Sequence, residues 1–75
     1  MSRSEFEQIT ERLLEENDRG EKQVIKLLTK NREFYIILNL IEEITTEVDR
    51  YKIDLADGSS IKGSYKDITE IVEVI

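Results

Sequence analysis

The chain has 75 residues, with 11 basic and 17 acidic side chains and a net charge of −6. It contains no Cys and no His, which excludes disulfides, thiolate nucleophiles, ordinary zinc sites and imidazole-based catalytic triads. The acidic balance argues against broad, nonspecific binding to nucleic acid or anionic membranes. A chain of this length predicts a single domain over residues 1–75.

The apolar content is high enough for a core, but only for a small one. At 39% apolar residues the chain is not typical of disorder, and a domain of this size buries only about 60% of its unfolded surface. Good packing or self-association must supply the stability, so a homo-oligomer is as well supported as a monomer. The longest apolar stretch, 34–41, is far shorter than the ~20 residues of a membrane span. We expect a cytoplasmic protein without a membrane partner or a cofactor.

The first segment predicts a helix over 4–17. Ser4 followed by Glu7 fits a capping box, in which each side chain accepts a hydrogen bond from the other residue's backbone. The residues from Asn17 to Gly20 end the helix. Its apolar face has helical spacing and consists of Phe6, Ile9, Leu13 and Leu14.

The segment 21–48 has two interpretations. Its first part reads as an amphipathic helix or as a strand that runs into a turn at 30–33, where Asn31 tolerates a left-handed conformation. We prefer the strand because the next residues, 34–37, are strongly β-prone. The prediction is therefore a β-rich region over 22–75, while a helix over 34–48 remains open.

The third segment predicts a hairpin. Tyr51, Ile53 and Leu55 alternate with polar or small residues, as in a half-buried strand, and Asp57-Gly58 marks the turn. A second strand at 59–65 follows, then a turn near 65–67 and a last strand made of the apolar C-terminal residues.

The register of this hairpin follows from the side chains. A two-residue loop would set Ile53 against Lys62, whereas a three-residue loop at 56–58 pairs Ile53 with Ile61 and Tyr51 with Gly63. The longer loop also places Gly58 where positive φ is required. Gly63, inside a strand, predicts a bulge or a bend.

The resulting order is a helix followed by about five strands, which predicts an α+β fold with a small antiparallel SH3-like or Sm-like sheet or barrel. Residues 51–75 are similar to the closing strands of the YolD-like bacterial family, which also implies this fold and no catalytic activity. The similarity rests on Tyr51-Lys52-Ile53-Asp54-Leu55, Asp57-Gly58, Ile61 and Tyr65-Lys66-Asp67-Ile68-Thr69-Glu70-Ile71. The glycine that this family tends to carry in its long second strand is replaced here by Leu38-Asn39-Leu40.

Two sets of residues are candidates for a protein-binding surface. Ile36 and Leu38 belong to the apolar 34–41 stretch, whose unpaired edge would accept another chain. Residues 34–49 contain acidic but no basic side chains, namely Glu42, Glu43, Glu47 and Asp49. These carboxylates could bind a hard cation or act as acid and base, but a solvated strand end explains them better, so we expect no metal site.

A third set is basic. Lys22, Lys26, Lys30 and Arg32 form a local concentration of positive charge that could contact phosphates, and Tyr35 could stack on bases.

We therefore expect a small, non-enzymatic interaction or regulatory protein with a protein partner. One alternative is an acidic inhibitor that mimics nucleic acid, of the phage or mobile-element type. The other is an Sm-like binder of single-stranded nucleic acid.

Overall fold

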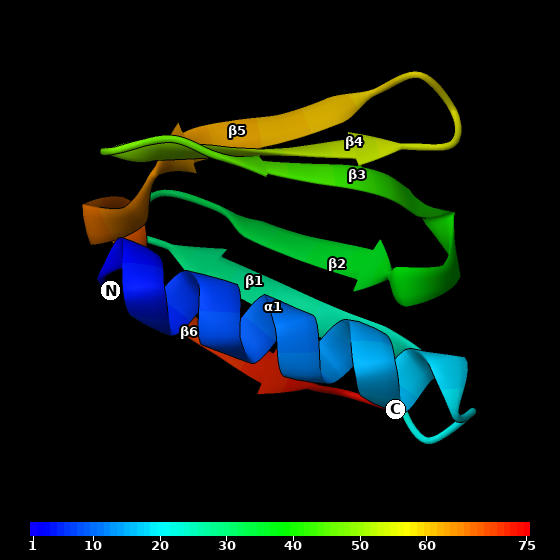
Figure 1. Cartoon of the computed structure of the whole chain (residues 1–75). Coiled ribbons are helices and arrows are strands. Elements are labelled where there is room, and N and C mark those ends of the chain that lie inside the picture. The colour runs from blue at the N-terminus through cyan, green and yellow to red at the C-terminus, as the bar shows by residue number, and fades with distance from the viewer.

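A computed structural model describes all residues from Met1 to Ile75. One N-terminal helix, α1, precedes six short strands (Figure 1). The elements are α1 (Arg3–Asp18), β1 (Val24–Thr29), β2 (Glu33–Ile37), β3 (Ile41–Thr46), β4 (Arg50–Leu55), β5 (Ser60–Ser64) and β6 (Ile68–Glu73). Two single turns of 3₁₀ helix, η1 (Leu38–Leu40) and η2 (Tyr65–Asp67), precede β3 and β6. The predicted α+β class is confirmed.

The strands form two antiparallel three-stranded sheets, with the orders β2-β1-β6 and β3-β4-β5. The sheets are not closed into a barrel. There are six strands rather than about five because η1 interrupts the apolar stretch 34–41 and sends the chain from the first sheet into the second. The predicted turn at 65–67 is η2, which returns the chain to the first sheet.

The helix begins at Arg3, one residue earlier than the sequence predicted, and its capping box lies two residues earlier. The N-cap is Ser2, whose Oγ accepts a hydrogen bond from the Glu5 backbone N–H at 3.1 Å, while Glu5 accepts one from the Ser2 N–H at 3.2 Å. Both Ser2 and Ser4 are followed three residues later by Glu, so the capping-box pattern occurs twice. The earlier start frees Glu7 for a contact with β3. The hydrogen bonds from Ser2 lower the pKa of Glu5.

The strand interpretation of 21–31 is confirmed, and the helix over 34–48 is wrong. Burial alternates along β1 and β2, with Ile25, Leu27 and Ile36 in the core. This period of two is that of a strand. The turn between them is closed by hydrogen bonds from the Thr29 N–H to the Arg32 carbonyl and from the Arg32 N–H to Thr29 Oγ1. No residue other than glycine has positive φ, so the turn does not use a left-handed Asn31.

The three-residue hairpin loop is confirmed. Ile53 pairs with Ile61 and Tyr51 with Gly63, and the Leu55 N–H bonds to the Ser59 carbonyl across the loop at 2.9 Å. Gly58 has a φ of +89°, a region that L side chains rarely adopt.

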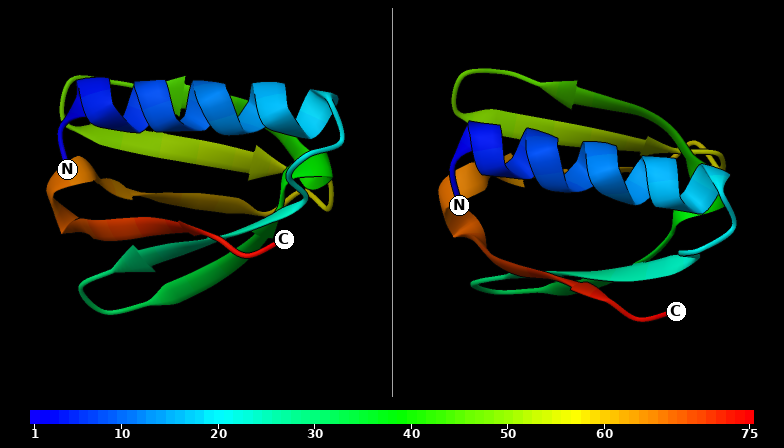
Figure 2. Two further views of the ribbon diagram at one scale, coloured as in Figure 1. Left: turned by 90° about the horizontal axis from the view of Figure 1, so that it is seen from below. Right: turned by 60° about the horizontal axis from the view of Figure 1, so that its bottom comes forward.

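The core lies between α1 and the two sheets, which the helix spans along one side (Figure 2). Its centre is an aromatic cluster in which the Phe6 ring lies 4.9 Å from that of Tyr51 and 5.5 Å from that of Tyr65. All ten buried residues are apolar or aromatic. The apolar helix face predicted from the sequence supplies Phe6 and Leu13 to this core, and Ile9 and Leu14 pack against it.

The aromatic cluster, and not a bulge, explains why residue 63 is a glycine. The β4–β5 register continues through Gly63 without a shift. A Cβ at this position would lie 3.2 Å from the Tyr51 hydroxyl oxygen, closer than ordinary van der Waals contact. The glycine therefore makes room for the Tyr51 side chain.

The two serines at the start of α1 should differ in their effect on stability. Ser2→Ala should lower the free energy of unfolding by about 1 kcal/mol because it removes the N-cap oxygen. Ser4→Ala, in the first turn, should leave it nearly unchanged. Urea denaturation of both variants measures the difference, and equal losses would contradict the assigned cap.

Gly63→Ala should destabilise the fold by about 1–3 kcal/mol, the usual range for overpacking. In a Tyr51→Phe background the loss should be smaller, because the nearest atom is the Tyr51 hydroxyl. A double-mutant cycle of unfolding free energies measures this coupling. Strictly additive losses would show that the hydroxyl is not the obstacle.

Candidate protein-binding groove

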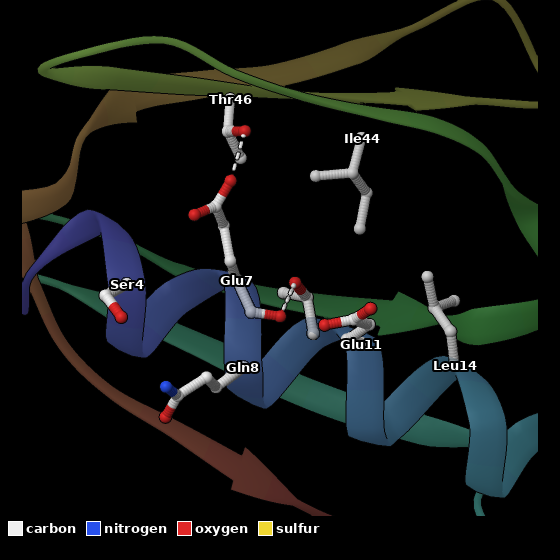
Figure 3. Close-up of a pocket in the computed structure, with 8 residues that line it drawn as sticks. Ser4, Glu7, Gln8, Glu11, Leu14, Ile44 and Thr46 are labelled. Atoms are coloured by element: carbon white, nitrogen blue, oxygen red, sulfur yellow. Dashed lines mark hydrogen bonds between the residues drawn. The ribbon is translucent and has the colours of Figure 1, made fainter.

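An open groove of about 520 Å³ runs between α1 and β3. Its walls include Glu7, Glu11 and Leu14 from the helix and Ile44 and Thr46 from the strand (Figure 3). The helical residues share one stripe because positions i, i+4 and i+7 lie on the same face. The groove therefore combines carboxylates with two apolar side chains.

One end of the groove is closed by contacts from the first turns of α1. Thr46 Oγ1 donates to Glu7 Oε2 at 2.8 Å, as Figure 3 shows. The Arg3 guanidinium donates to the Thr46 carbonyl at 3.2 Å and lies 3.5 Å from the Glu7 carboxylate. These three side chains attach the helix to the outer edge of β3.

Further along the same edge, the backbone of Ile44 is free. In an antiparallel pair, alternate residues direct their N–H and C=O groups towards the neighbouring strand. The Glu47 N–H bonds to the Arg50 carbonyl at 2.9 Å, so in the β3–β4 register Thr45 bonds to β4 and Ile44 does not. The Ile44 N–H and C=O thus point to the same side as the Thr46 carbonyl that Arg3 contacts.

The groove has uncompensated negative charge. Glu7 is paired with Arg3, but Glu11 is exposed and forms no ion pair. Glu11 is therefore the groove carboxylate available to a cation. Neither Glu7 nor Glu11 was predicted from the sequence to line a binding site, although their i, i+4 spacing beside Leu14 was a signal that could have identified them.

The predicted carboxylates lie outside the groove. β3 has a register shift between Ile41 and Glu43, and Glu43 pairs with Asp54 on the outer side of its sheet. Glu42 lies within the shift, and Glu47 follows the strand. All three glutamates are exposed and form no ion pair. They do not converge with other acidic residues into a group of three that could hold a metal ion.

The prediction that Ile36 and Leu38 form an exposed binding edge is wrong. Their relative exposures are 1% and 2%, and both belong to the core. Side chains alternate between the two faces of a strand, so an error of one residue moves a site from one face to the other. The exposed apolar residues of β2 are Tyr35 and Ile37, at 67% and 50%.

The predicted basic residues are spread along the first sheet and its turns. Lys26 lies 3.1 Å from Glu33 and 5.4 Å from the centre of the Tyr35 ring, and the hydrogen bond to Glu33 raises the pKa of Lys26. Lys22 and Lys30 lie 3.7 Å from the carboxylates of Glu73 and Asp67. Arg32 is exposed and forms no ion pair. The structure thus places a carboxylate beside each of the three lysines.

Comparison of the chain with known protein families, with curated proteins and with solved structures gives no match. No helix in the structure has the length and hydrophobicity needed to cross a membrane.

The fold should lose stability at alkaline pH through its buried tyrosines. Burial raises the pKa of Tyr51 and of Tyr65 above the ordinary value of about 10. Since the folded pKa exceeds the unfolded one, this stabilisation is complete below pH ~10 and is lost as pH rises through the folded pKa. Urea midpoints between pH 8 and 11 should fall in the wild type.

The decline should be shallower in Tyr51→Phe, which has one fewer buried group to ionise. If the pH dependence of Tyr51→Phe matches that of the wild type, ionisation of Tyr51 is not a cause of the alkaline loss.

Proposed function

We propose that this chain is a small, non-enzymatic, cytoplasmic protein-binding module that regulates a partner by holding an extended, basic segment of it in the α1–β3 groove. The observation that supports this proposal is the unpaired backbone of Ile44 beside the free carboxylate of Glu11. An exposed strand edge provides affinity through main-chain hydrogen bonds, and the neighbouring side chains provide specificity.

The partner segment would lie antiparallel or parallel to β3 as an added strand. Its backbone would exchange hydrogen bonds with the N–H and C=O of Ile44. Its side chains would alternate, with an apolar one against Leu14 and Ile44 and a Lys or Arg beside Glu11. The net charge of −6 would favour the approach of such a cationic segment.

A second candidate function is an acidic surface that mimics nucleic acid. It is supported by Glu42, Glu43 and Glu47, which are exposed and free of ion pairs. In that case binding would depend on these carboxylates and not on the groove. The Sm-like alternative gains no such support, because the lysines that would contact phosphates are already next to carboxylates.

Random 12-residue peptides displayed on phage and selected on the immobilised protein test the groove. We expect enrichment of peptides that alternate apolar and basic residues. Synthetic copies, followed by fluorescence anisotropy, should bind more weakly as salt increases.

Glu11→Lys should weaken this binding at least tenfold. Glu15→Lys is the matched control, because it makes the same charge change one helical turn away at an exposed residue that does not line the groove. Equal losses in the two variants, or no enrichment of basic peptides, would contradict the groove. A larger loss from Glu43→Lys than from Glu11→Lys would favour the nucleic-acid mimic.

A further inference from the structure

The outer edge of β2 is a second unpaired strand edge, and it belongs to a different sheet from the α1–β3 groove. β2 stands at the end of the order β2-β1-β6, so one side of it has no neighbour. Tyr35 and Ile37 on this strand are both largely exposed. Large apolar side chains beside an unpaired strand edge are typical of a surface that pairs with another chain.

The backbone N–H groups along this edge are unpaired at three positions. The Thr29 N–H bonds to the Arg32 carbonyl, and the Leu38 N–H bonds to the Gln23 carbonyl. These two bonds define the alternation in the β1–β2 pair. It follows that Glu33, Tyr35 and Ile37 direct their N–H and C=O groups away from β1. The Ile37 carbonyl already accepts the first hydrogen bond of η1 as its N-cap, so the edge offers three free donors and two free acceptors.

The other outer edges of the two sheets are protected more fully than β2, whose only charged side chain, Glu33, is paired with Lys26. α1 lies along the edges of β3 and β6, through Arg3 with the Thr46 carbonyl and through Arg12, 3.6 Å from Glu73. β5 carries an exposed lysine, Lys62, between small and polar residues. β2 has no proline and its register with β1 has no bulge. Proteins normally protect an edge by one of these means.

We propose that β2 pairs with β2 of a second copy, antiparallel and about a two-fold axis at Tyr35. In this register Tyr35 faces Tyr35 of the second copy, and Glu33 faces its Ile37. The free groups then form four hydrogen bonds across the junction: two between the Tyr35 residues, and one from each Ile37 N–H to the Glu33 carbonyl of the other copy. Shifting the two-fold axis by one residue in either direction loses one of the three residue pairs.

The charges at the edge are compatible with a second copy. The chain carries −6 overall, but Glu33 is neutralised by Lys26 at 3.1 Å. The two Glu33 side chains lie four residues apart along the junction, about 13 Å, which exceeds the Debye length of about 8 Å at physiological salt. Salt therefore screens most of the repulsion between these two side chains.

Lys26 also favours edge pairing over face-to-face packing of the two sheets. Its side chain lies on the same outer face as Tyr35, on the central strand β1. Face-to-face packing would bury this ammonium group with Glu33, at a high cost in desolvation. Edge pairing leaves both groups in water.

The junction is small, because only five residues of each chain take part in it. Standard interfaces bury about 800 Å² of each partner, so we expect the dimer to be weak and reversible.

Sedimentation equilibrium of the wild type up to about 1 mM should show a monomer–dimer equilibrium, and Ile37→Pro should weaken it at least tenfold. Ile37 has a φ of −82°, close to the value of proline, and its N–H does not bond to β1, so the fold should tolerate the change. Ile37→Ala is the control, because it shortens the side chain and keeps the N–H donor. It should dimerise more strongly than the proline variant.

A single cysteine tests the register. Directly opposed residues in a hydrogen-bonded pair have Cα atoms about 5.5 Å apart, which suits a disulfide. Tyr35→Cys should therefore form a disulfide dimer in air, and Val48→Cys, at an 85% exposed apolar site on a turn of the other sheet, should not.

The effect of salt distinguishes dimerisation through β2 from peptide binding in the groove. Screening should strengthen the dimer of like-charged chains and weaken peptide binding to Glu11. Glu11→Lys should leave dimerisation intact. A wild type that stays monomeric at 1 mM, open-ended oligomers, or equal dimerisation of Ile37→Pro and Ile37→Ala would overturn the proposal.

Discussion

Phe6 stacks on Tyr51 and contacts Tyr65, and these aromatic contacts connect α1 to the second sheet and to the turn that leads back to the first. Tyr65 extends the connection, because its hydroxyl donates to the Glu47 carbonyl at 2.7 Å and holds the β3–β4 turn. Gly63 leaves the space that Tyr51 occupies. With no cysteine available for a disulfide, much of the stability of this small domain must come from packing, so both surfaces described above depend on the cluster.

The position of α1 explains why some strand edges are covered and others are not. The same cluster that fixes Phe6 sets the helix along β3 and β6, where Arg3, Glu7 and Arg12 make their polar contacts. The helix covers the β3 edge at Thr46 and leaves it open at Ile44, which creates the groove. The outer edge of β2, at the end of the order β2-β1-β6, stays unpaired.

The alternation of side chains along β2 decides which residues serve the core and which are available to a partner. Ile36 and Leu38 complete the core, while Tyr35 and Ile37 on the opposite face are exposed. Where the β-prone stretch 34–41 would form one long strand, η1 divides it and turns the remainder into β3. The two sheets therefore stay open, and each keeps an edge with unpaired backbone groups.

The sequence by itself determined the local structure. The helix from 4 to 17, the strand at 51–55, the three-residue loop and the register of Ile53 with Ile61 all follow from interactions between near neighbours, such as helical spacing, turn chemistry and matched side chains. Even the error at the N-cap was local, because Ser2 and Ser4 both satisfy the same pattern.

Only the tertiary structure decided which faces and edges are exposed. The side of β2 that is buried, the pairing of Lys22 and Lys30 with distant carboxylates, and the meeting of Glu11 with Ile44 all depend on how the helix and the two sheets pack together. Those contacts join residues as far apart as Arg3 and Thr46, and neither periodicity nor spacing along the chain encodes them directly.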